Sequence, residues 1–471
     1  MRPVSLDPAS VSISESEKSN QSPRPGKRPK PRPRLVSLDA FRGFIMIVLA
    51  AHGFGISELA NTPEQSPLWK VLDRPTVSWI AFHFQHPPWQ SSFVPGTHDA
   101  TIGNAWLHLG VSFWDLIQPA FMLMVGVALP FSLINRQRTG QSPLRRGIHA
   151  LIRSLVLILM GVFLYSLQNT STNWIFPNVL AQIGLGYFLV YLLTNRRLRV
   201  QLAAFLVILA GTWCFIHLTP PPANYVPEEV NAQRARGDVF APPYRQWSKN
   251  GNAFSSFDRW FLNQFPRPED QGEFRFNSGG YQTLNFVPSM TTMLLGVFCG
   301  QILLSSVRPG EKFLSLLVLA LVLWSTGVMT GATCCPVVKR IWTPAWVLLS
   351  GGYVVAMLAM FYLLFDLWPL QWLARPLVVV GVNSLLVYFL GELLTGWLAE
   401  NVYRHLSGPL EALLGAFANM FHLLQNLGTP RADAGAVMME LFAPVIHALC
   451  AVAAIWLICY WLYRQRVFLK I

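Results

Sequence analysis

Long apolar blocks alternate with short polar segments along most of this chain, from residue 35 to its end. Most blocks have the roughly 20 residues that an α-helix needs to cross a hydrocarbon core of about 30 Å. The pattern predicts about ten membrane-spanning helices, at 39–58, 112–135, 150–168, 175–194, 200–218, 284–305, 313–332, 342–365, 376–396 and 441–463. We therefore expect an all-α fold, a polytopic integral membrane helix bundle.

The segments outside these spans differ in character. Residues 1–34 are rich in Ser, Pro, Lys and Arg and contain no aromatic residue, which predicts a disordered basic tail. Two long loops, 59–111 and 219–283, are expected to lie on one side of the membrane, to fold over the bundle and to shape a site. The apolar stretch 410–425 predicts an amphipathic helix at the membrane surface. Residues 35–471 are thus expected to form one transmembrane domain.

Composition and charge support this interpretation. Hydrophobic residues make up 52% of the chain and charged residues only 13%, whereas about a quarter of a soluble domain is charged. The net charge of +13 comes largely from the first 34 residues and from alternate short loops, as orientation by positive charge requires. Both termini are therefore expected in the cytoplasm. Because orientation in the membrane explains the positive charge, no nucleic-acid partner is expected. Lys339 and Arg340, in a loop expected outside, are exceptions to the pattern.

Small and sulfur-containing residues inside the apolar blocks also predict local structure. Gly296 and Gly300 form a small-xxx-small pair, which is typical of close contact between membrane helices. The six cysteines show no metal-ligand spacing and are interpreted mainly as buried free thiols. The adjacent Cys334 and Cys335 lie in a loop, where a vicinal disulfide is the alternative.

The first long loop contains most of the candidate chemistry, with four histidines: His83, His86, His98 and His108. Histidine titrates near neutrality and is the commonest general base for an amine or hydroxyl. Asp115, at the outer end of the second span, could orient such a base. His83, His86, His98 and Asp99 do not form the two tight pairs of a tetrahedral metal site, so no metal is expected. A solvated loop histidine is the plainer alternative.

Polar residues also occur at or inside the apolar blocks. Asp39 and Arg42 are three residues apart, so on a helix they share a face and can pair. Ionisable groups at a membrane boundary are costly unless they are paired or functional. Asn285 begins the sixth span and Asn383 lies within the ninth, where their amides could form hydrogen bonds between helices.

Five motifs occur in order: SLDAFRG at 37–43, HPPW at 86–89, GVSFWDLIQPAFMLMVG at 110–126, LNFVPS at 284–289 and GVNSLLVY at 381–388. Together they resemble the heparan-α-glucosaminide N-acetyltransferase family, particularly its bacterial relatives, over nearly all of residues 35–471. The resemblance implies an acyl-CoA-dependent N- or O-acyltransferase, in which acetyl-CoA on the cytoplasmic side acetylates an amino sugar or glycan across the membrane. It also implies a multi-pass protein of the bacterial inner (plasma) membrane and suggests a homodimer.

The family's catalytic histidine lies in an HxxWxG stretch just before a DL-x-x-P helix. His86 and Trp89 match the start of this pattern and Gly110 and Asp115 its end, but about twenty residues are inserted between them. His108, close to Gly110, is the alternative base. The family also has an asparagine after the first motif, where this chain has His52 or Gly53.

The resemblance assigns roles to these residues. His86 would deprotonate the acceptor, with Asp115 orienting its ring. Arg42 would contact the phosphates of CoA, and Asp39, Asn285 and Asn383 are the further candidate cofactor-binding residues. Two other functions stay open: a transporter or flippase for a glycan or lipid precursor, and a membrane scaffold without catalytic activity.

Overall fold

The computed structural model describes residues 35–89, 111–368 and 370–469, and in these ranges the regular structure is entirely helical. The predicted tail at 1–34 lies outside the described residues. Eight helices in these ranges are long and apolar enough to cross a membrane: α6 (Phe113–Arg138), α7 (Pro143–Ser166), α9 (Leu198–His217), α11 (Phe286–Leu304, or Thr283–Leu304 with the turn η6), α12 (Pro309–Thr333), α13 (Pro344–Tyr362, extended to Leu367 by the π-helical turn η8), α15 (Ser384–Met420) and α17 (Ala443–Arg464). The prediction of an all-α, polytopic membrane protein is confirmed.

The first and the fourth of the ten predicted spans take a different form. The first consists of α1 (Val36–Ala50) followed by His52–Ala60, which comprises the turn η1 and α2 (Ile56–Ala60), with a bend of 47° between them. Counted as one span, this pair makes a ninth. The fourth predicted span is α8 (Val179–Thr194), which at 16 residues is apolar but short for a membrane crossing.

The predicted span at 376–396 is broken. The helix α14 (Gln371–Gly381) ends there and α15 begins at Ser384. Between them Asn383 leaves helical geometry. Its side chain donates to the backbone oxygen of Val467 (3.1 Å) and accepts from the backbone nitrogen of Leu469 (3.0 Å).

α15 then continues through Pro409 to Met420, so most of the stretch 410–425 belongs to this helix. The prediction of a separate surface helix there is wrong. Pro409 costs the helix about 3 kcal/mol, but the Leu, Glu and Ala residues that follow it are strong helix formers.

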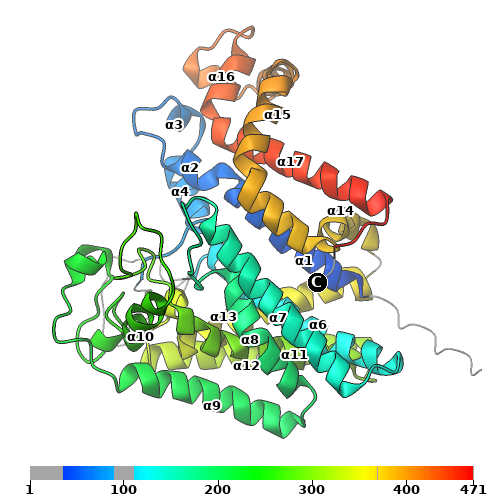
Figure 1. The fold of residues 1–471 in the computed structure, drawn as a ribbon. Coiled ribbons are helices and arrows are strands. Elements are labelled where there is room, and N and C mark those ends of the chain that lie inside the picture. Colours follow the sequence, from blue (N-terminus) through cyan, green and yellow to red (C-terminus); the bar gives the residue numbers. More distant parts are fainter. Residues whose placement is uncertain (1–34, 90–110, 369, 470–471) are drawn as a thin grey trace, which may run out of the picture. The chain divides into compact units, whose positions relative to one another are not determined.

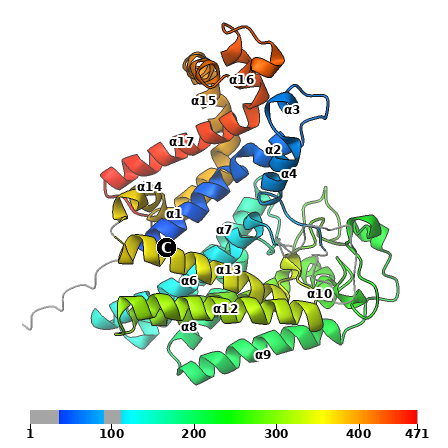
Figure 2. The ribbon, with the colours of Figure 1, turned by 180° about the vertical axis from the view of Figure 1, so that it is seen from behind.

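The helices form two groups, which Figures 1 and 2 show from opposite sides. In one group α1, α14, α15 and α17 pack together, with α16 (Ala434–Leu441) against α15. In the other, α6, α8, α9 and α13 pack around α11, while α7 packs against α8 and α12 against α13. The helix α1 also touches α6 and α13 and so joins the two groups.

Close backbone contacts hold each group together. A Cβ atom at Gly43 would lie 1.8 Å from the backbone oxygen of Leu377 in α14. A Cβ atom at Gly296 in α11 would lie 2.0 Å from the backbone oxygen of Leu123 in α6, and one at Gly300 would lie 2.7 Å from that of Val127. The predicted small-residue contact is confirmed, and its partner helix is α6.

The substitution Gly296→Ala is expected to lower the free energy of unfolding by about 1–3 kcal/mol, because one methyl group must force α6 and α11 apart. The measurement is the thermal unfolding midpoint of the purified protein in detergent. Gly211→Ala in α9 is the matched control, since nothing lies within 4 Å of the added atom, and this variant should be as stable as the parent. Equal midpoints for both variants would contradict the contact.

Short helices order the described parts of the two long loops at one end of the bundle, which we call the loop end (Figure 1). The first loop contains α3 (Leu68–Val71) and α4 (Arg74–Phe82). The second contains α10 (Ala253–Phe261) and the turns η2 (Pro227–Val230), η3 (Arg234–Arg236), η4 (Arg245–Trp247), η5 (Leu262–Gln264) and η6 (Thr283–Asn285). Phe176 and Leu262 are buried in one cluster with Val162 of α7, which attaches the second loop to the helices. All six cysteines are free, including Cys334 and Cys335, so the vicinal disulfide is absent.

Candidate functional site

Asp115 lies in the first turn of α6, at the loop end of the bundle. The Ser112 hydroxyl caps this helix by accepting from the backbone nitrogen of Asp115 (3.1 Å), in the Ser-x-x-acid pattern of a helix start. The partial positive charge of the helix N-terminus also favours a carboxylate there. The backbone nitrogen of Trp114 donates to the backbone oxygen of His83 (2.8 Å), so the first loop is attached at the same turn.

His86 contacts Asp115 directly. Its Nδ1 lies 2.6 Å from Oδ1 of Asp115, so the structure brings together the two residues expected to act as base and orienting acid. The two prolines after His86 restrict the backbone that leads to Trp89. Trp89 is buried and donates from Nε1 to the backbone oxygen of Trp247 in the second loop (3.0 Å). The segment of the first loop that carries His86 is therefore anchored to the second loop.

Lys339 completes this group. Its Nζ lies 2.9 Å from the same Oδ1 of Asp115, and only 7% of its side chain is accessible. Its neighbours Val338, Ile341 and Trp342 are buried, so the loop between α12 and α13 folds into the protein. The lysine that broke the charge pattern of the loops is thus an internal partner of a carboxylate.

The three groups set the protonation state of the histidine. Burial lowers the pKa of His86, and the positive charge of Lys339 acts in the same direction, while Asp115 partly opposes both. Burial alone would lower the pKa of Lys339, but the Asp115 carboxylate outweighs it, so this pKa is raised and the lysine stays charged. A neutral His86 that donates from Nδ1 to Asp115 has a free lone pair at Nε2.

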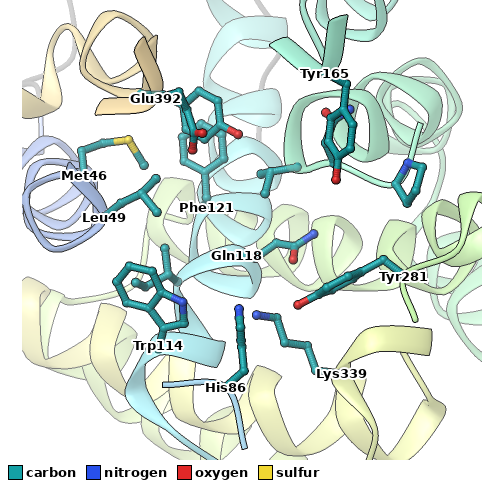
Figure 3. Close-up of a pocket in the computed structure, with 15 residues that line it drawn as sticks. Met46, Leu49, His86, Trp114, Gln118, Phe121, Tyr165, Tyr281, Lys339 and Glu392 are labelled. Atoms are coloured by element: carbon teal, nitrogen blue, oxygen red, sulfur yellow. The ribbon is translucent and has the colours of Figure 1, made fainter. Parts of the chain in front are cut away.

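His86 opens onto a cavity of about 280 Å³ between the two helix groups, and 39% of its side chain is accessible. Figure 3 shows His86 and Lys339 at one end, Gln118 in the middle, and Tyr165 and Glu392 at the other end. The cavity is lined by Met46, Leu49, His86, Trp114, Ile117, Gln118, Phe121, Tyr165, Pro177, Asn178, Val179, Tyr281, Lys339, Tyr388 and Glu392. Aromatic rings together with a few polar groups are typical of a small-molecule site.

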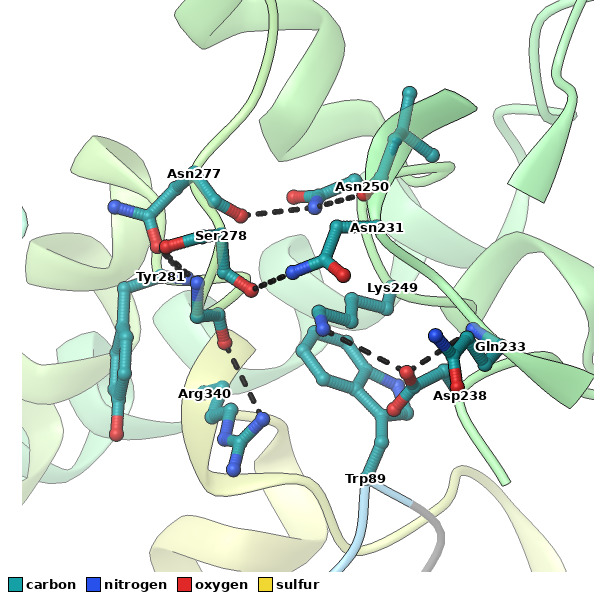
Figure 4. Close-up of polar contacts among 12 residues, drawn as sticks. Trp89, Asn231, Gln233, Asp238, Lys249, Asn250, Asn277, Ser278, Tyr281 and Arg340 are labelled. Atoms are coloured by element: carbon teal, nitrogen blue, oxygen red, sulfur yellow. Dashed lines mark hydrogen bonds and ion pairs between the residues drawn. The ribbon is translucent and has the colours of Figure 1, made fainter. Parts of the chain in front are cut away.

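Tyr281, which lines the cavity, lies in a turn before α11. Figure 4 shows the polar contacts of this turn. The side-chain oxygen of Asn277 accepts from the backbone nitrogens of Gly279 (2.9 Å) and Tyr281 (3.2 Å). Gly280 has φ +80°, and a Cβ atom there would lie 2.4 Å from the Trp89 ring, so only glycine fits. The turn therefore packs against the segment that carries His86.

Polar contacts connect the loops around this turn. Arg340 donates to the backbone oxygen of Gly279 (3.4 Å), and Asn285 donates to the backbone oxygen of Arg340 (2.7 Å). Lys249, which lies beside Trp89 in Figure 4, pairs with Asp238 (3.6 Å). These contacts join the segments that carry Tyr281, Lys339 and His86.

The structure separates the other predicted site residues from His86. Asn285 is buried beside the loop of Lys339, where it does not line the cavity, and Asn383 holds the C-terminal segment. Asp39 and Arg42 lie on α1 nearer its start than the cavity residues Met46 and Leu49. Arg42 precedes Met46 by four residues, so both occupy one face of α1.

The remaining residues singled out in the sequence lie away from the cavity or outside the described residues. His52 and Gly53 begin a left-handed turn, η1 (His52–Gly55), and neither lines the cavity. The alternative base His108, with His98 and Asp99, lies outside the described residues. Among the residues that the structure does describe, no three His, Cys, Asp or Glu side chains cluster closely enough to hold a metal ion.

Of the predicted site residues that the structure describes, only His86 lines the cavity, so sequence reasoning missed most of its lining, including Tyr281, Lys339 and Glu392. Lys339 could have been identified because it is a positive residue in a loop expected outside, where the charge pattern predicts few lysines and arginines. Glu392, a carboxylate inside an apolar block, carried a similar signal. Tyr281 carried none beyond the glycines before it.

No protein-family model matches the chain, and a search of functionally curated proteins finds no match.

Proposed function

We propose that this protein is a transmembrane acyltransferase that moves an acetyl group from cytoplasmic acetyl-CoA to an amino sugar or glycan on the other side of the membrane. The observation that supports it is the array of His86, Asp115 and Lys339 at one end of a cavity inside the helix bundle. A neutral imidazole oriented by a buried carboxylate is the arrangement by which enzymes deprotonate a nucleophile.

In this proposal the acceptor amine attacks the thioester carbonyl of acetyl-CoA and transfers a proton to Nε2 of His86. The new C–N bond forms, the C–S bond breaks, and the departing CoA thiolate takes the proton from the imidazolium. Asp115 stabilises the transient charge on His86 through Nδ1, and Lys339 keeps Asp115 ionised. Tyr281 and Gln118, which line the same cavity, are placed to donate to the carbonyl oxygen.

The donor would enter from the end at which α1 begins. Arg42, Met46 and Leu49 follow one face of α1 toward the cavity. The Arg42 guanidinium would bind phosphate oxygens of CoA, for which its planar donors are suited. Asp39, three residues before Arg42, would orient it. Asn383 and Asn285 would act less directly, through the C-terminal segment and the Lys339 loop that they hold.

Calorimetric titration of acetyl-CoA into the detergent-purified protein tests the donor site. We expect saturable binding that Arg42→Ala weakens by about tenfold or more, because a charged hydrogen bond contributes about 1.5–3 kcal/mol. His86→Ala should retain binding. The exposed Arg145→Ala is the matched control and should bind like the parent. Absence of binding for acetyl-CoA and longer acyl-CoAs would contradict the proposal.

The break between α14 and α15 favours a second candidate, a transporter for a glycan or lipid precursor. Discontinuous helices around a central site are common in transporters. Movement of a labelled precursor across vesicle membranes without consumption of acetyl-CoA would favour transport. Release of free CoA in step with acceptor modification would favour the transferase.

The pH dependence of transfer follows from the lowered pKa of His86. A general base works in its neutral form, so activity should rise with pH as the imidazole loses its proton and then level off. Because this pKa lies below the ordinary value of about 6.5, the rise should be centred below that pH. Initial rates at substrate concentrations well below KM, between mildly acidic and neutral pH, measure it. A midpoint above the ordinary value would contradict this role.

A further inference from the structure

The end of the cavity opposite His86 is formed by Tyr165 of α7 and Glu392 of α15 (Figure 3). Tyr388, four residues before Glu392 on α15, also lines the cavity. Glu392 lies within a helix long and apolar enough to cross the membrane. A carboxylate at such a position is costly, and ionisable residues in membrane helices commonly mark the path of a substrate. The reaction steps above give Glu392 no role.

The two helices that flank this end belong to different groups. In the described part of the chain, the extended contacts of α7 are with α8, whereas α15 packs against α1, α16 and α17. α7 and α15 make no extended contact with each other within these residues. The far wall of the cavity is thus formed by side chains from two helices that are not packed together.

The surface on both flanks is accessible and mostly apolar. On α7, Tyr165 is 40% exposed, next to the exposed Phe163 and Leu167. On α15, five of the six residues from Glu392 to Trp397 are exposed, and three of these are Leu393, Leu394 and Trp397. Apolar side chains that are exposed on helices long enough to cross a membrane are suited to contact with lipid, so both flanks of this end of the cavity could border the bilayer.

We propose that the acceptor reaches the cavity sideways from the bilayer, as an amphiphile with a sugar head and a lipid tail. This inference rests on the proposed function and names the class of its acceptor. The head passes between Tyr165 and Glu392, and the Glu392 carboxylate accepts hydrogen bonds from sugar hydroxyls. The amine of the head then lies toward His86, at the other end of the cavity.

The size of the cavity agrees with an acceptor whose sugar head enters the cavity while its lipid tail stays outside. Pockets for drug-sized ligands have volumes of about 300–1,000 Å³, and this cavity is near the lower limit at about 280 Å³. A sugar ring fits such a space, but a sugar with its lipid chain does not. The chain would therefore stay between α7 and α15, in contact with the apolar side chains on either flank.

Two probes with the same head and different tails test this route: dodecyl β-glucosaminide and methyl β-glucosaminide. The full-length protein is reconstituted in nanodiscs of phosphatidylethanolamine and phosphatidylglycerol. Its thermal unfolding midpoint is measured with each probe, and transfer of radiolabelled acetyl from acetyl-CoA is measured separately. The variants are Glu392→Gln and, as a matched control two turns further along α15, the exposed Glu400→Gln.

We expect the dodecyl probe to raise the midpoint and to be acetylated with a kcat/KM at least about tenfold above that of the methyl probe. Glu392→Gln should lower the kcat/KM for the dodecyl probe by about tenfold and make its shift of the midpoint smaller, whereas Glu400→Gln should leave both unchanged. Stabilisation by the dodecyl probe that depends on Glu392, without acetyl transfer, would support the lateral route and overturn the acyltransferase. Equal transfer to both probes would support the acyltransferase and overturn the lateral route. Neither stabilisation nor transfer with the dodecyl probe would also overturn the route.

Discussion

Lys339→Met is expected to lower the free energy of unfolding by about 3–5 kcal/mol and to reduce acetyl transfer to background. Lys339 and Asp115 have 7% and 9% of their side chains accessible, so the substitution leaves a carboxylate almost fully enclosed without its cation. Removing one partner of a buried ion pair is costly for this reason. Thermal unfolding and initial transfer rates of the purified variant measure the two effects.

A double substitution separates stability from catalysis. In Asp115→Asn with Lys339→Met neither charge is left unpaired, so most of the lost stability should return. Transfer should stay low, because a neutral amide in place of the carboxylate cannot stabilise a protonated His86 to the same extent. Lys70→Met, at an exposed position of the first long loop, is the control and should match the parent in both measurements. An unstable double variant or an active single variant would contradict this account.

His86→Gln is expected to reduce transfer by about 100- to 10,000-fold, which is the usual contribution of a positioned general base. The unfolding midpoint should change little, because His86 is partly accessible from the cavity and Asp115 keeps Lys339 as its partner. The residual activity should also lose the pH dependence that the imidazole imposes. Single-turnover rates at several pH values test both statements.

His83→Gln is the matched control for this experiment. His83 lies three residues earlier in the same loop, at the C-terminal end of α4, and it does not line the cavity. The control should keep at least half of the parent rate, since its hydrogen bond to α6 comes from the backbone. Turnover of His86→Gln at the parent rate would remove His86 as the base. His108, the alternative base, would then be the next residue to test.

The sequence by itself determined the class of the protein and most of its helices. Lipid as the surrounding solvent requires long apolar segments, and those segments are visible in the chain without any tertiary information. The small-residue pair at Gly296 and Gly300 also predicted a close contact correctly, because only small side chains allow helix backbones to approach. The pairing of His86 with Asp115 was also predicted, because the loop that contains His86 leads into the helix whose first turn carries Asp115.

Only the tertiary structure decided which distant residues share the site. Lys339 lies 224 positions after Asp115, and Glu392 belongs to a helix of the other group. Spacing along the chain does not reveal that these residues are neighbours, because helix packing brings them together. In lipid that packing depends on van der Waals contacts and hydrogen bonds between helices. The break at Asn383 escaped prediction for the same reason. At the break, Asn383 makes two hydrogen bonds to the C-terminal segment, and such bonds exist only after the chain has folded.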